Sequence, residues 1–385
     1  MANNNDNKVL NVPPLRFPEF TKEWEEHALA EYLDFKNGLN PDVKRIGRGL
    51  PFISVMDILA DGTINYDSIR GKVEATEREI ENFSVEKGDI LFLRSSETLE
   101  DVGRANVYMD NRTAVYGGFV IRGRKIGDYN PLFFKYLLST PLARKRTCRM
   151  GAGAQHFNIG QDGLSKISLC FPLMEEQNKI ARLLSLIDER IATQNKIIDK
   201  LQSLIKGLRV CCMQRNGSNN VYLSEIAQIY QPQTISSAEL TEDGFLVYGA
   251  NGIIGKYKDY NHKTEQICIT CRGNTCGMVN YTKPMSWITG NAMVINTDKY
   301  QDKVYKKYLY HYLSAYNFNS IISGSGQPQI VRTPLEKLKI TLPTISEQKQ
   351  KAMILDKVQD KIEINHNILN LYILQKQYLL RQMFI

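Results

Sequence analysis

Residues 164–188, LSKISLCFPLMEEQNKIARLLSLID, recur at residues 335–359 as LEKLKITLPTISEQKQKAMILDKVQ. The offset is constant at 171 positions, so Pro172 falls on Pro343 and the Glu-Gln pair at 176–177 falls on the pair at 347–348. An internal repeat of this kind predicts two copies of one structural unit. The whole chain therefore has to be interpreted as a duplicated architecture.

A long amphipathic helix is predicted after each proline. In the first copy apolar residues recur at alternating steps of four and three over about five heptads, which indicates a coiled coil. The seam positions of this helix are Ile180, Leu184, Ile187, Ile191, Gln194, Ile198, Leu201, Ile205, Leu208 and Cys212. The second copy repeats the pattern from Lys351 to Met383. Two surface helices that pack separately on their own domains are the alternative.

One amide stands in the middle of each seam. Gln194 is the strongly polar residue of the first seam between Ile180 and Leu208, and Asn365 occupies the same position 171 residues later. If the helices pair antiparallel about a pseudo-twofold axis, residues near the midpoint meet their own counterparts. We therefore expect Gln194 and Asn365 to share a hydrogen bond that fixes the register of the helices. Two amides turned outward to solvent are the alternative.

Upstream of each helix, the two copies match at their ends and diverge in the middle. LAEYL (29–33) corresponds to LSEIA (223–227), and FLRSSETLEDVGRANV (92–107) resembles ITCRGNTCGMVN (269–280) with a shorter loop in the second copy. GAGAQ (151–155) answers SGSGQ (323–327) with a one-residue slip. Similar ends around a divergent middle suggest one scaffold that carries two different surfaces.

Each copy is predicted to be a mixed α/β domain. Short β-rich runs at 89–94, 119–123 and 292–296 are bounded by turn residues and predict strands. Helices are predicted at 131–139 after Asn130 and at 304–314 after Asp302, with these two side chains as N-caps. The fold class is therefore α+β: two mixed α/β domains, at 1–173 and 216–344, and two long helices, at 174–215 and 345–385.

Composition describes a soluble and mildly basic chain. Hydrophobic residues make up 43% of the sequence and charged residues 23%, and 49 basic against 41 acidic residues give a formal net charge of +8. This surplus is compatible with nucleic-acid binding. The polar N-terminus lacks the pattern of a secretion signal, and seven irregularly spaced cysteines suggest reduced thiols, so we expect a cytoplasmic protein.

Candidate catalytic and metal motifs fail on inspection. Asn130-Pro-Leu-Phe133 resembles a methyltransferase motif, but its third position differs, and a helix cap is the better interpretation. The stretch Gly249–Lys256 lacks the spacing of a phosphate loop and has Tyr257 where Ser or Thr should bind magnesium. Cys268, Cys271 and Cys276 lack a fourth zinc ligand at regular spacing, which favours a strand with buried thiols. No metal site is predicted.

Basic and amide-bearing loops recur at the same points of both copies. Cations and backbone N–H groups can hold phosphates, and Gln, Asn or His can reach base edges. The candidate DNA-binding residues are Arg94, Ser95, Arg104, Lys145, Arg146, Arg149, Gln155 and His156 in the first copy, and Arg272, Asn274, Gln327, Gln329 and Arg332 in the second. A solvated charged turn is the alternative for each residue taken alone.

The sequence closely resembles the specificity subunit of Type I restriction-modification systems. The resemblance extends from LRFPEFTKEWEEHALAEYL (15–33) to YLLRQMF (378–384). It is carried by the two Pro-(x)3-Glu-Gln helix starts, by QICITCRGNTCGMVN and ITGNAMVIN (266–296), and by VYGANGIIGKY (247–257). Together these motifs are specific, although each one alone is not.

The resemblance implies a non-catalytic subunit that recognises DNA for a larger complex. Its two target recognition domains would each read one half of a split double-stranded DNA sequence. Its two helices would pack antiparallel as a spacer and bind two methyltransferase subunits, to which restriction/translocase subunits attach. S-adenosylmethionine, ATP and magnesium are then expected on those partners, which supply adenine methylation and DNA cleavage, and no cofactor is expected on this chain. A lone DNA methyltransferase or nuclease of unusual motif and a structural coiled-coil adaptor are the alternatives.

Overall fold

The computed structural model describes residues 10–213, 219–250, 252–324 and 326–385, which form two compact units. Unit 1 extends to Gln194 and also includes Ile368–Ile385, whereas unit 2 comprises Asn195–Asn367. The predicted domain boundary at 215–216 lies outside the described residues. Each unit contains one mixed α/β domain and one end of each long helix.

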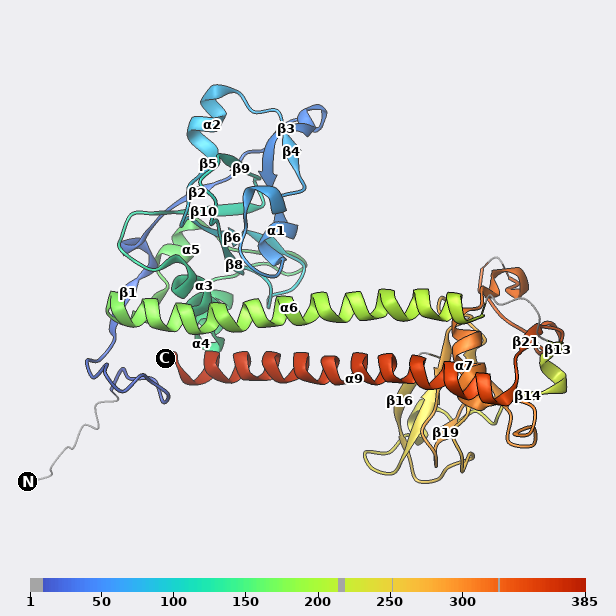
Figure 1. The fold of residues 1–385 in the computed structure, drawn as a ribbon. Helices are drawn as coiled ribbons and strands as arrows, with labels where there is room; N and C mark the ends of the chain where they lie inside the picture. Colours follow the sequence, from blue (N-terminus) through green and yellow to red (C-terminus); the bar gives the residue numbers. More distant parts are fainter. Residues whose placement is uncertain (1–9, 214–218, 251, 325) are drawn as a thin grey trace, which may run out of the picture. The chain divides into compact units, whose positions relative to one another are not determined.

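Unit 1 is built around two sheets (Figure 1). Its strands are β1 (Glu25–Ala28), β2 (Leu33–Asn37), β3 (Ile46–Ile53), β4 (Lys72–Val73), β5 (Ser84–Val85), β6 (Ile90–Leu93), β7 (Ser95–Ser96), β8 (Ala105–Val107), β9 (Ala114–Tyr116), β10 (Val120–Lys125), β11 (Phe157–Asn158) and β12 (Ser168–Phe171). Its α-helices are α1 (Val55–Leu59), α2 (Glu77–Phe83), α3 (Pro131–Ser139), α4 (Pro141–Arg149), α5 (Gln161–Ser165) and the start of α6 (Met174–Met213).

The main sheet of unit 1 has the order β2-β10-β6-β8 and is antiparallel throughout. All four residues of β6 are buried, as expected for a central strand that is covered on both faces. The second sheet, β4-β3-β9-β5, contains one parallel pair, β3 with β9. Strand β1 pairs with β12, and β7 pairs with β11.

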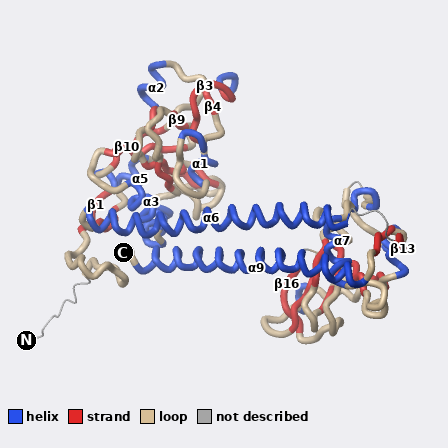
Figure 2. Tube along the Cα trace, viewed as in Figure 1, coloured by secondary structure: helices blue, strands red, loops and turns tan. Residues whose placement is uncertain are grey.

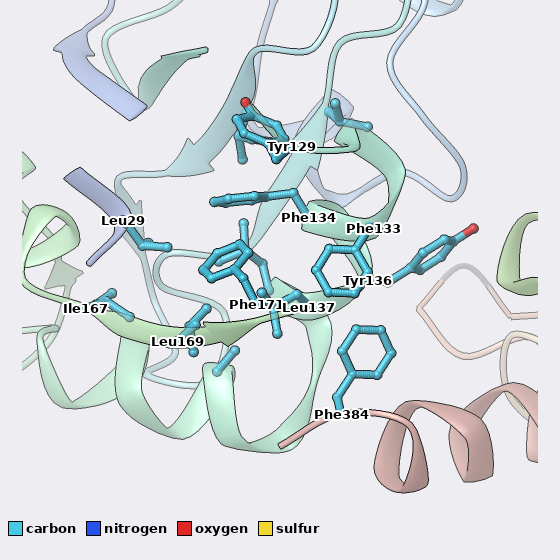
Figure 3. Close-up of a cluster of buried hydrophobic side chains, with 14 of the residues drawn as sticks. Leu29, Tyr129, Phe133, Phe134, Tyr136, Leu137, Ile167, Leu169, Phe171 and Phe384 are labelled. Atoms are coloured by element: carbon cyan, nitrogen blue, oxygen red, sulfur yellow. The ribbon is translucent and has the colours of Figure 1, made fainter. Parts of the chain in front are cut away.

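Aromatic side chains fill the core between the main sheet, α3, the start of α6 and the end of α9 (Figure 3). Helix α3 contributes Phe133 and Phe134, and the chain returns at its C-terminus to place Phe384 against Phe133, with 5.5 Å between the ring centroids. Trp24 contacts Phe384 from the N-terminal side at 6.1 Å. The C-terminal segment is therefore part of the hydrophobic core of unit 1.

Unit 2 repeats this plan with fewer elements. Its strands are β13 (Asn219–Tyr222), β14 (Gln228–Tyr230), β15 (Phe245–Gly249), β16 (Gly252–Tyr257), β17 (Ile267–Thr270), β18 (Val279–Tyr281), β19 (Trp287–Ile288), β20 (Ala292–Asn296) and β21 (Lys339–Leu342). Its helices are α7 (Lys306–Ala315), α8 (Arg332–Glu336), the end of α6 and most of α9 (Ile345–Gln382). In Figure 2 the strands gather in the two domains, whereas α6 and α9 are continuous helices.

The strand order confirms the internal repeat. The main sheet of unit 2, β14-β20-β17-β18, has the same order as β2-β10-β6-β8, and the pair β13-β21 corresponds to β1-β12. The parallel pair also recurs, as β15 with β19. The first copy is longer because α1, α2 and β5 lie between β3 and β6, and the described part of unit 2 has no helix at the corresponding place. The predicted α+β class with two mixed domains is therefore correct.

Helices α6 and α9 run antiparallel within each unit. In unit 1, Asp188 pairs with Lys376 at 2.5 Å, and two residues later Arg190 lies over the ring of Tyr372. In unit 2 a separate apolar cluster joins Leu201, Ile205 and Leu208 of α6 to Leu355, Val358 and Ile362 of α9. In unit 2 the predicted seam positions supply these contacts, whereas in unit 1 Asp188 and Arg190 lie beside the seam of α6. Two helices that pack separately are therefore ruled out in both units.

A buried glutamine explains why Glu-Gln recurs after each proline. The Gln177 Nε2 donates to the Pro172 carbonyl at 3.0 Å, and its Oε1 accepts from the Asn130 backbone N–H at 3.0 Å. In unit 2 the Gln348 Nε2 donates to the Pro343 carbonyl at 2.9 Å, and its Oε1 accepts from the Tyr305 N–H at 2.8 Å. Each glutamine therefore joins the start of a long helix to the start of the domain's own helix.

The predicted N-caps had different outcomes. The Asn130 Oδ1 accepts from the backbone N–H groups of Leu132 and Phe133 at 3.0 Å each, which confirms it as the cap of α3. The prediction for Asp302 was wrong, because α7 begins at Lys306 and its N-cap residue is Tyr305. The amide of Gln348 binds the Tyr305 N–H, so a tertiary contact replaces a local side-chain cap at this point.

Candidate nucleic-acid interface

A loop leaves the end of the central strand of each main sheet; we call it the strand-end loop. It comprises residues 94–103 in unit 1 and 271–277 in unit 2. In unit 1 the Gly103 N–H donates to the Leu93 carbonyl at 2.8 Å, and in unit 2 the Gly277 N–H donates to the Thr270 carbonyl at 2.9 Å. These equivalent hydrogen bonds confirm the predicted match between residues 92–107 and 269–280, with the shorter loop in the second copy.

A second loop, which we call the glycine loop, comprises residues 151–158 in unit 1 and 323–329 in unit 2. Isolated bridges close it between Ala152 and Asn158, and between Ser323 and Gln329. Its tight turn requires glycine: Gly153 has a φ of +141°, and a Cβ there would lie 2.0 Å from the His156 carbonyl oxygen. Gly324 has a φ of +91°, and a Cβ there would lie 2.5 Å from the Gln327 carbonyl oxygen.

The glycine loops correct one detail of the sequence comparison. Gly153 and Gly324 are 171 positions apart, and so are His156 and Gln327, whose carbonyls they approach. The offset therefore stays constant and no one-residue slip occurs. Gln327 corresponds to His156 rather than to Gln155, because the turn geometry and not the shared glutamine aligns the two loops. Ser325, within the second loop, lies outside the described residues.

Each unit brings its strand-end loop and its glycine loop together. The Ile159 N–H donates to the Arg94 carbonyl at 3.0 Å, and the Ile330 N–H donates to the Cys271 carbonyl at 3.0 Å. In unit 1, the Ser95 Oγ is also hydrogen-bonded to the Asn158 Oδ1. In unit 2, Arg272 bridges Gln329, and the Gly273 N–H donates to the Pro328 carbonyl at 3.0 Å. The same two loops therefore lie side by side in both units, a contact that the recurrence of the loops alone did not predict.

Most of the candidate side chains are exposed on these loops or beside them. The exposed candidates are Lys145, Arg149, Gln155, His156, Arg272, Asn274, Gln327, Gln329 and Arg332. Arg332 forms an ion pair with Glu336 at 2.6 Å on α8, so it is oriented by its own helix. Arg94 and Ser95 are half-buried at the start of the strand-end loop.

The basic stretch 144–149 forms helix α4, and two of its cations face inward. Arg146 forms an ion pair with Glu26 at 2.9 Å and also donates to the Ser168 carbonyl. Arg144 donates to the Glu100 and Val102 carbonyls at 2.9 and 2.7 Å, and burial lowers the pKa of its guanidinium. Arg144 therefore positions the strand-end loop. Lys145 and Arg149 are the cations of this stretch that are left for a ligand.

Arg104 lies in a different cavity from Arg94. It forms an ion pair with Asp101 at 3.0 Å and lines a cavity of about 400 Å³ together with Lys135 and Arg144. Burial lowers the pKa of Lys135 to about 8. Arg94 instead lines a depression of about 480 Å³. The structure therefore does not place Arg104 in the group formed by Arg94 and the glycine loop.

Three amide side chains join Arg94 in its depression, and the sequence analysis missed them. Asn37 ends strand β2, Asn158 ends the glycine loop, and Gln161 begins α5. Arginine and amides converging on one depression are the groups that bind phosphates and base edges. The constant offset could have identified two of them, because Asn158 falls on Gln329 and Gln161 falls on Arg332.

The structure also bears on the rejected motifs. Cys268 lies within strand β17 and Cys271 directly follows it, both are buried, and burial raises the pKa of the Cys268 thiol. Within residues 10–213, 219–250, 252–324 and 326–385, no group of three or more His, Cys, Asp or Glu side chains could hold a metal ion. Strands β15 and β16 form a hairpin over 245–257, so this stretch joins two paired strands; its Asn251 lies outside the described residues.

The two seam amides are buried. Gln194 is 7% exposed and Asn365 is 9% exposed. The alternative of two amides turned outward to solvent is therefore wrong. The Asn365 Nδ2 donates to the Lys361 carbonyl of its own helix at 2.6 Å. The hydrogen bond between Gln194 and Asn365 stays a prediction.

None of the helices in the described part of the chain is both long and apolar enough to cross a membrane.

Comparisons with known proteins agree on one family. The model of the Type I restriction modification DNA specificity domain matches residues 21–203 and 216–371. A relative, the Type I restriction enzyme MjaVIII specificity subunit of Methanocaldococcus jannaschii, is 26% identical, with 91% of this chain and 88% of that protein covered.

Solved structures show the same fold. The type I restriction-modification S subunit from M. genitalium has a TM-score of 0.67 at 16% identity, with 97% of this chain and 99% of that chain covered. A chain from a structure that concerns complex assembly and conformational transition of the type I R-M system has a TM-score of 0.56 at 14% identity, with 96% and 99% covered.

Proposed function

The chain belongs to the Type I restriction modification DNA specificity family, and on this premise we propose that each of its two units reads one half of a split DNA sequence. DNA sequence recognition is the function of this family, and membership covers nearly the whole chain. The family resemblance implies this division between two domains, and our proposal adds the loops that read each half. It assigns residues 94–103 and 151–158 to one half-site and residues 271–277 and 323–329 to the other.

One observation carries this proposal. The same hydrogen bond, from Ile159 to Arg94 and from Ile330 to Cys271, holds the same two loops together in both units, although the exposed side chains differ. A duplicated scaffold with different exposed chemistry suits two readers of different sequences. Exposed Lys145, Arg149 and Arg272 can neutralise phosphates, and exposed Gln155, His156, Gln327 and Gln329 can reach base edges.

The long helices carry exposed apolar side chains that suit partner subunits. In unit 1, Leu371, Leu374 and Tyr378 of α9 are all exposed, and their spacing places them on one face of the helix. Exposed apolar clusters of this kind mark protein-binding surfaces. We assign this face to a methyltransferase subunit, with restriction/translocase subunits joining the same complex. A structural relative comes from work on type I complex assembly, which supports such partners.

The chemistry of the complex is assigned to those partners. Methyl transfer to adenine and DNA cleavage would take place on them, and they would bind S-adenosylmethionine, ATP and magnesium. This chain would hold the complex on its target, without a catalytic role and within the cytoplasm. A lone methyltransferase or nuclease is the less favoured alternative, since the relatives are named as specificity subunits.

Methylation mapping tests the proposed function. Genomic DNA from cells with and without this gene is sequenced for methylated adenine. We expect one split motif to lose its methylation when the gene is deleted, and complementation to restore it. Unchanged methylation together with sequence-independent binding by the purified chain would contradict DNA recognition and favour a structural adaptor.

Co-purification tests the assignment of the helix face. Leu371→Asp and Leu374→Asp place charges in the apolar face and should reduce co-purification of the methyltransferase subunit by at least tenfold, since a buried unpaired charge is costly. Gln202→Asp, an exposed change on α6 away from this face, is the matched control and should leave co-purification unchanged. Equal recovery of the subunit with all three variants would contradict the assignment.

A further inference from the structure

An exposed apolar depression lies in unit 1 beside the strand-end loop. Its volume is about 310 Å³, and its lining includes Leu39, Ile46, Met56, Gly118 and Phe119. Phe119 is 66% exposed and Met56 is 75% exposed. Single exposed apolar side chains are ordinary, but several that rim one hollow indicate a binding surface.

Arg94 connects this depression to the polar one. The Phe119 carbonyl accepts from the Arg94 backbone N–H at 2.9 Å, and the Arg94 Nη1 donates to the Gly118 carbonyl at 3.2 Å. The same arginine lines the polar depression with Asn37, Asn158 and Gln161. Arg94 therefore lines the polar depression and is hydrogen-bonded to the backbone of two residues that line the apolar one. Both depressions lie beside the strand-end loop, which begins at Arg94.

The charges around the apolar depression also suit DNA. The short 3-10 helix at its edge (Val43–Arg45) carries Lys44, which is exposed and forms no ion pair with any described residue. Arg48, on the following strand, is largely exposed and pairs with Glu74 at 2.7 Å. Cations beside an apolar hollow can hold the phosphate backbone while the hollow meets a base. The apolar group that DNA presents in its major groove is the 5-methyl group of thymine.

We propose that Phe119 and Met56 contact the 5-methyl group of a thymine and so select thymine at one position of the half-site that unit 1 reads. This inference rests on the proposed function and adds to it the identity of one base and of the residues that select it. The hydrophobic contact distinguishes thymine from cytosine at a place where no hydrogen bond is needed.

The second copy has a different side chain at this place. The Cys271 N–H donates to the Asn291 carbonyl at 3.2 Å, which matches the bond from Arg94 to Phe119, so Asn291 corresponds to Phe119. Asn291 is also exposed, and it carries an amide where unit 1 carries an apolar ring. An amide in this position can hydrogen-bond a base edge instead of packing on a methyl group. The two units therefore differ in chemistry at one equivalent, exposed position.

Deoxyuridine substitution tests the proposal, because uracil lacks only the methyl group. The full-length chain is bound to DNA that carries the mapped target, with the thymines of one half or the other replaced by deoxyuridine. We expect the wild type to bind roughly fourfold more weakly when the half read by unit 1 lacks its methyl groups. Phe119→Ala and, as a second variant, Met56→Ala should weaken binding to the thymine DNA and make it insensitive to uracil.

Asn291→Ala is the matched control and should keep the full sensitivity to uracil in the half read by unit 1. Equal binding of thymine and uracil DNA by the wild type would overturn the proposal, and so would a Phe119→Ala variant that keeps the sensitivity. Loss of a partner subunit by Phe119→Ala with unchanged discrimination would assign the depression to a protein and overturn it too. Failure of the proposed function would look different, since the wild type would then not distinguish its target from scrambled DNA.

Discussion

At the scale of single residues, two buried glutamines define how each long helix starts. Gln177 and Gln348 make equivalent hydrogen bonds in units that share no residues, and in both units the amide satisfies backbone groups that local structure leaves unpaired. A glutamate could not do the same, since its carboxylate cannot donate to a carbonyl. This explains why Gln recurs in a repeat in which most positions differ.

Replacing either glutamine should destabilise the chain. Gln177→Leu and Gln348→Leu leave a buried carbonyl and a backbone N–H without their partner, which should lower the free energy of unfolding by about 1–3 kcal/mol each. Denaturant unfolding measures the loss. Gln202→Leu, an exposed change on α6, is the control and should stay within about 0.5 kcal/mol of the wild type. A loss no larger than that of the control would show that these bonds do not support the fold.

His311 is a second buried residue with a specific role. It is fully buried on α7; its Nε2 lies 3.0 Å from Asp356 Oδ1, and its Nδ1 accepts from the Arg209 Nε at 3.3 Å. Lys307 also faces this group through its ion pair with Asp356. Burial lowers the pKa of His311, although the hydrogen bond to Asp356 acts in the opposite direction. The neutral ring is therefore the form that fits the fold.

The contribution of His311 to the stability of the chain should fall as the pH drops from 7 to 5. The pKa of His311 is lower in the folded chain than in the unfolded one, so below about pH 6.5 the unfolded chain takes up the proton first. The stabilisation is present above this pH and is lost below it. His311→Gln keeps a donor and an acceptor without the titration, so its unfolding free energy should change less over this range.

Unfolding curves at pH 7 and pH 5 measure this difference. His366→Gln, an exposed change on α9, serves as the control and should behave like the wild type. Identical pH dependence in the wild type and His311→Gln would show that His311 is not the titrating group.

At the scale of elements, the 3.5-residue seam determines how α6 and α9 pack. Predicted seam positions are buried in each unit: Ile180, Leu184 and Ile187 in unit 1, and Ile205, Leu355 and Ile362, which pack together across the two helices, in unit 2. Gln194 and Asn365 interrupt this apolar seam and are buried as well. Amides buried in an apolar seam lower stability and restrict the register of the helices.

Replacing both amides with leucine tests their role. The double variant Gln194→Leu with Asn365→Leu should raise the melting temperature by a few degrees, because the seam becomes wholly apolar. It should also recognise DNA with altered spacing between the half-sites more readily, because the register is no longer fixed. Thermal unfolding and binding to a series of spacer lengths measure the two effects. An unchanged spacer preference would contradict the predicted register bond, and Asn195→Leu, on the exposed side, is the control.

The elements that the sequence predicted well are those with a periodic or repeated signal. Periodicity predicted the long helices and the strands at 89–94, 119–123 and 292–296. The internal repeat predicted which loops of the two copies correspond to each other. The cap of α7 was mispredicted because the stabilising partner, Gln348, is distant in the sequence. For the same reason the inward orientation of Arg146, which depends on Glu26, could not be predicted from local sequence.

The candidate site was predicted to the level of loops but not of individual contacts. The glycine turn at Gly153 has a local cause, whereas Asn37 reaches the depression of Arg94 only because β2 pairs with β10 in the sheet. Phe119 was also missed as a candidate, since one apolar residue at the start of a predicted strand has no distinctive sequence signal. Its significance depends on the neighbours that the fold supplies.

At the scale of the whole molecule, duplication explains the chain. Two units with the same strand order each hold a strand-end loop against a glycine loop, and each contains one end of both long helices. The scaffold is common to both units, and the exposed residues of the loops differ. Duplication followed by divergence of the loops would give one chain two independent sequence preferences.

The most direct test is to measure the base preference of loop variants from each unit. Arg272→Ala and Gln327→Ala alter unit 2, and Arg149→Ala and Gln155→Ala alter unit 1. Each variant selects its preferred DNA from a random library, and the selected sequences are compared with those of the wild type. We expect a lost base contact to relax positions in one half-site only, by about 1–3 kcal/mol, with unit 1 and unit 2 variants affecting opposite halves. A single loop change that alters both halves would contradict the assignment of one half-site to each unit.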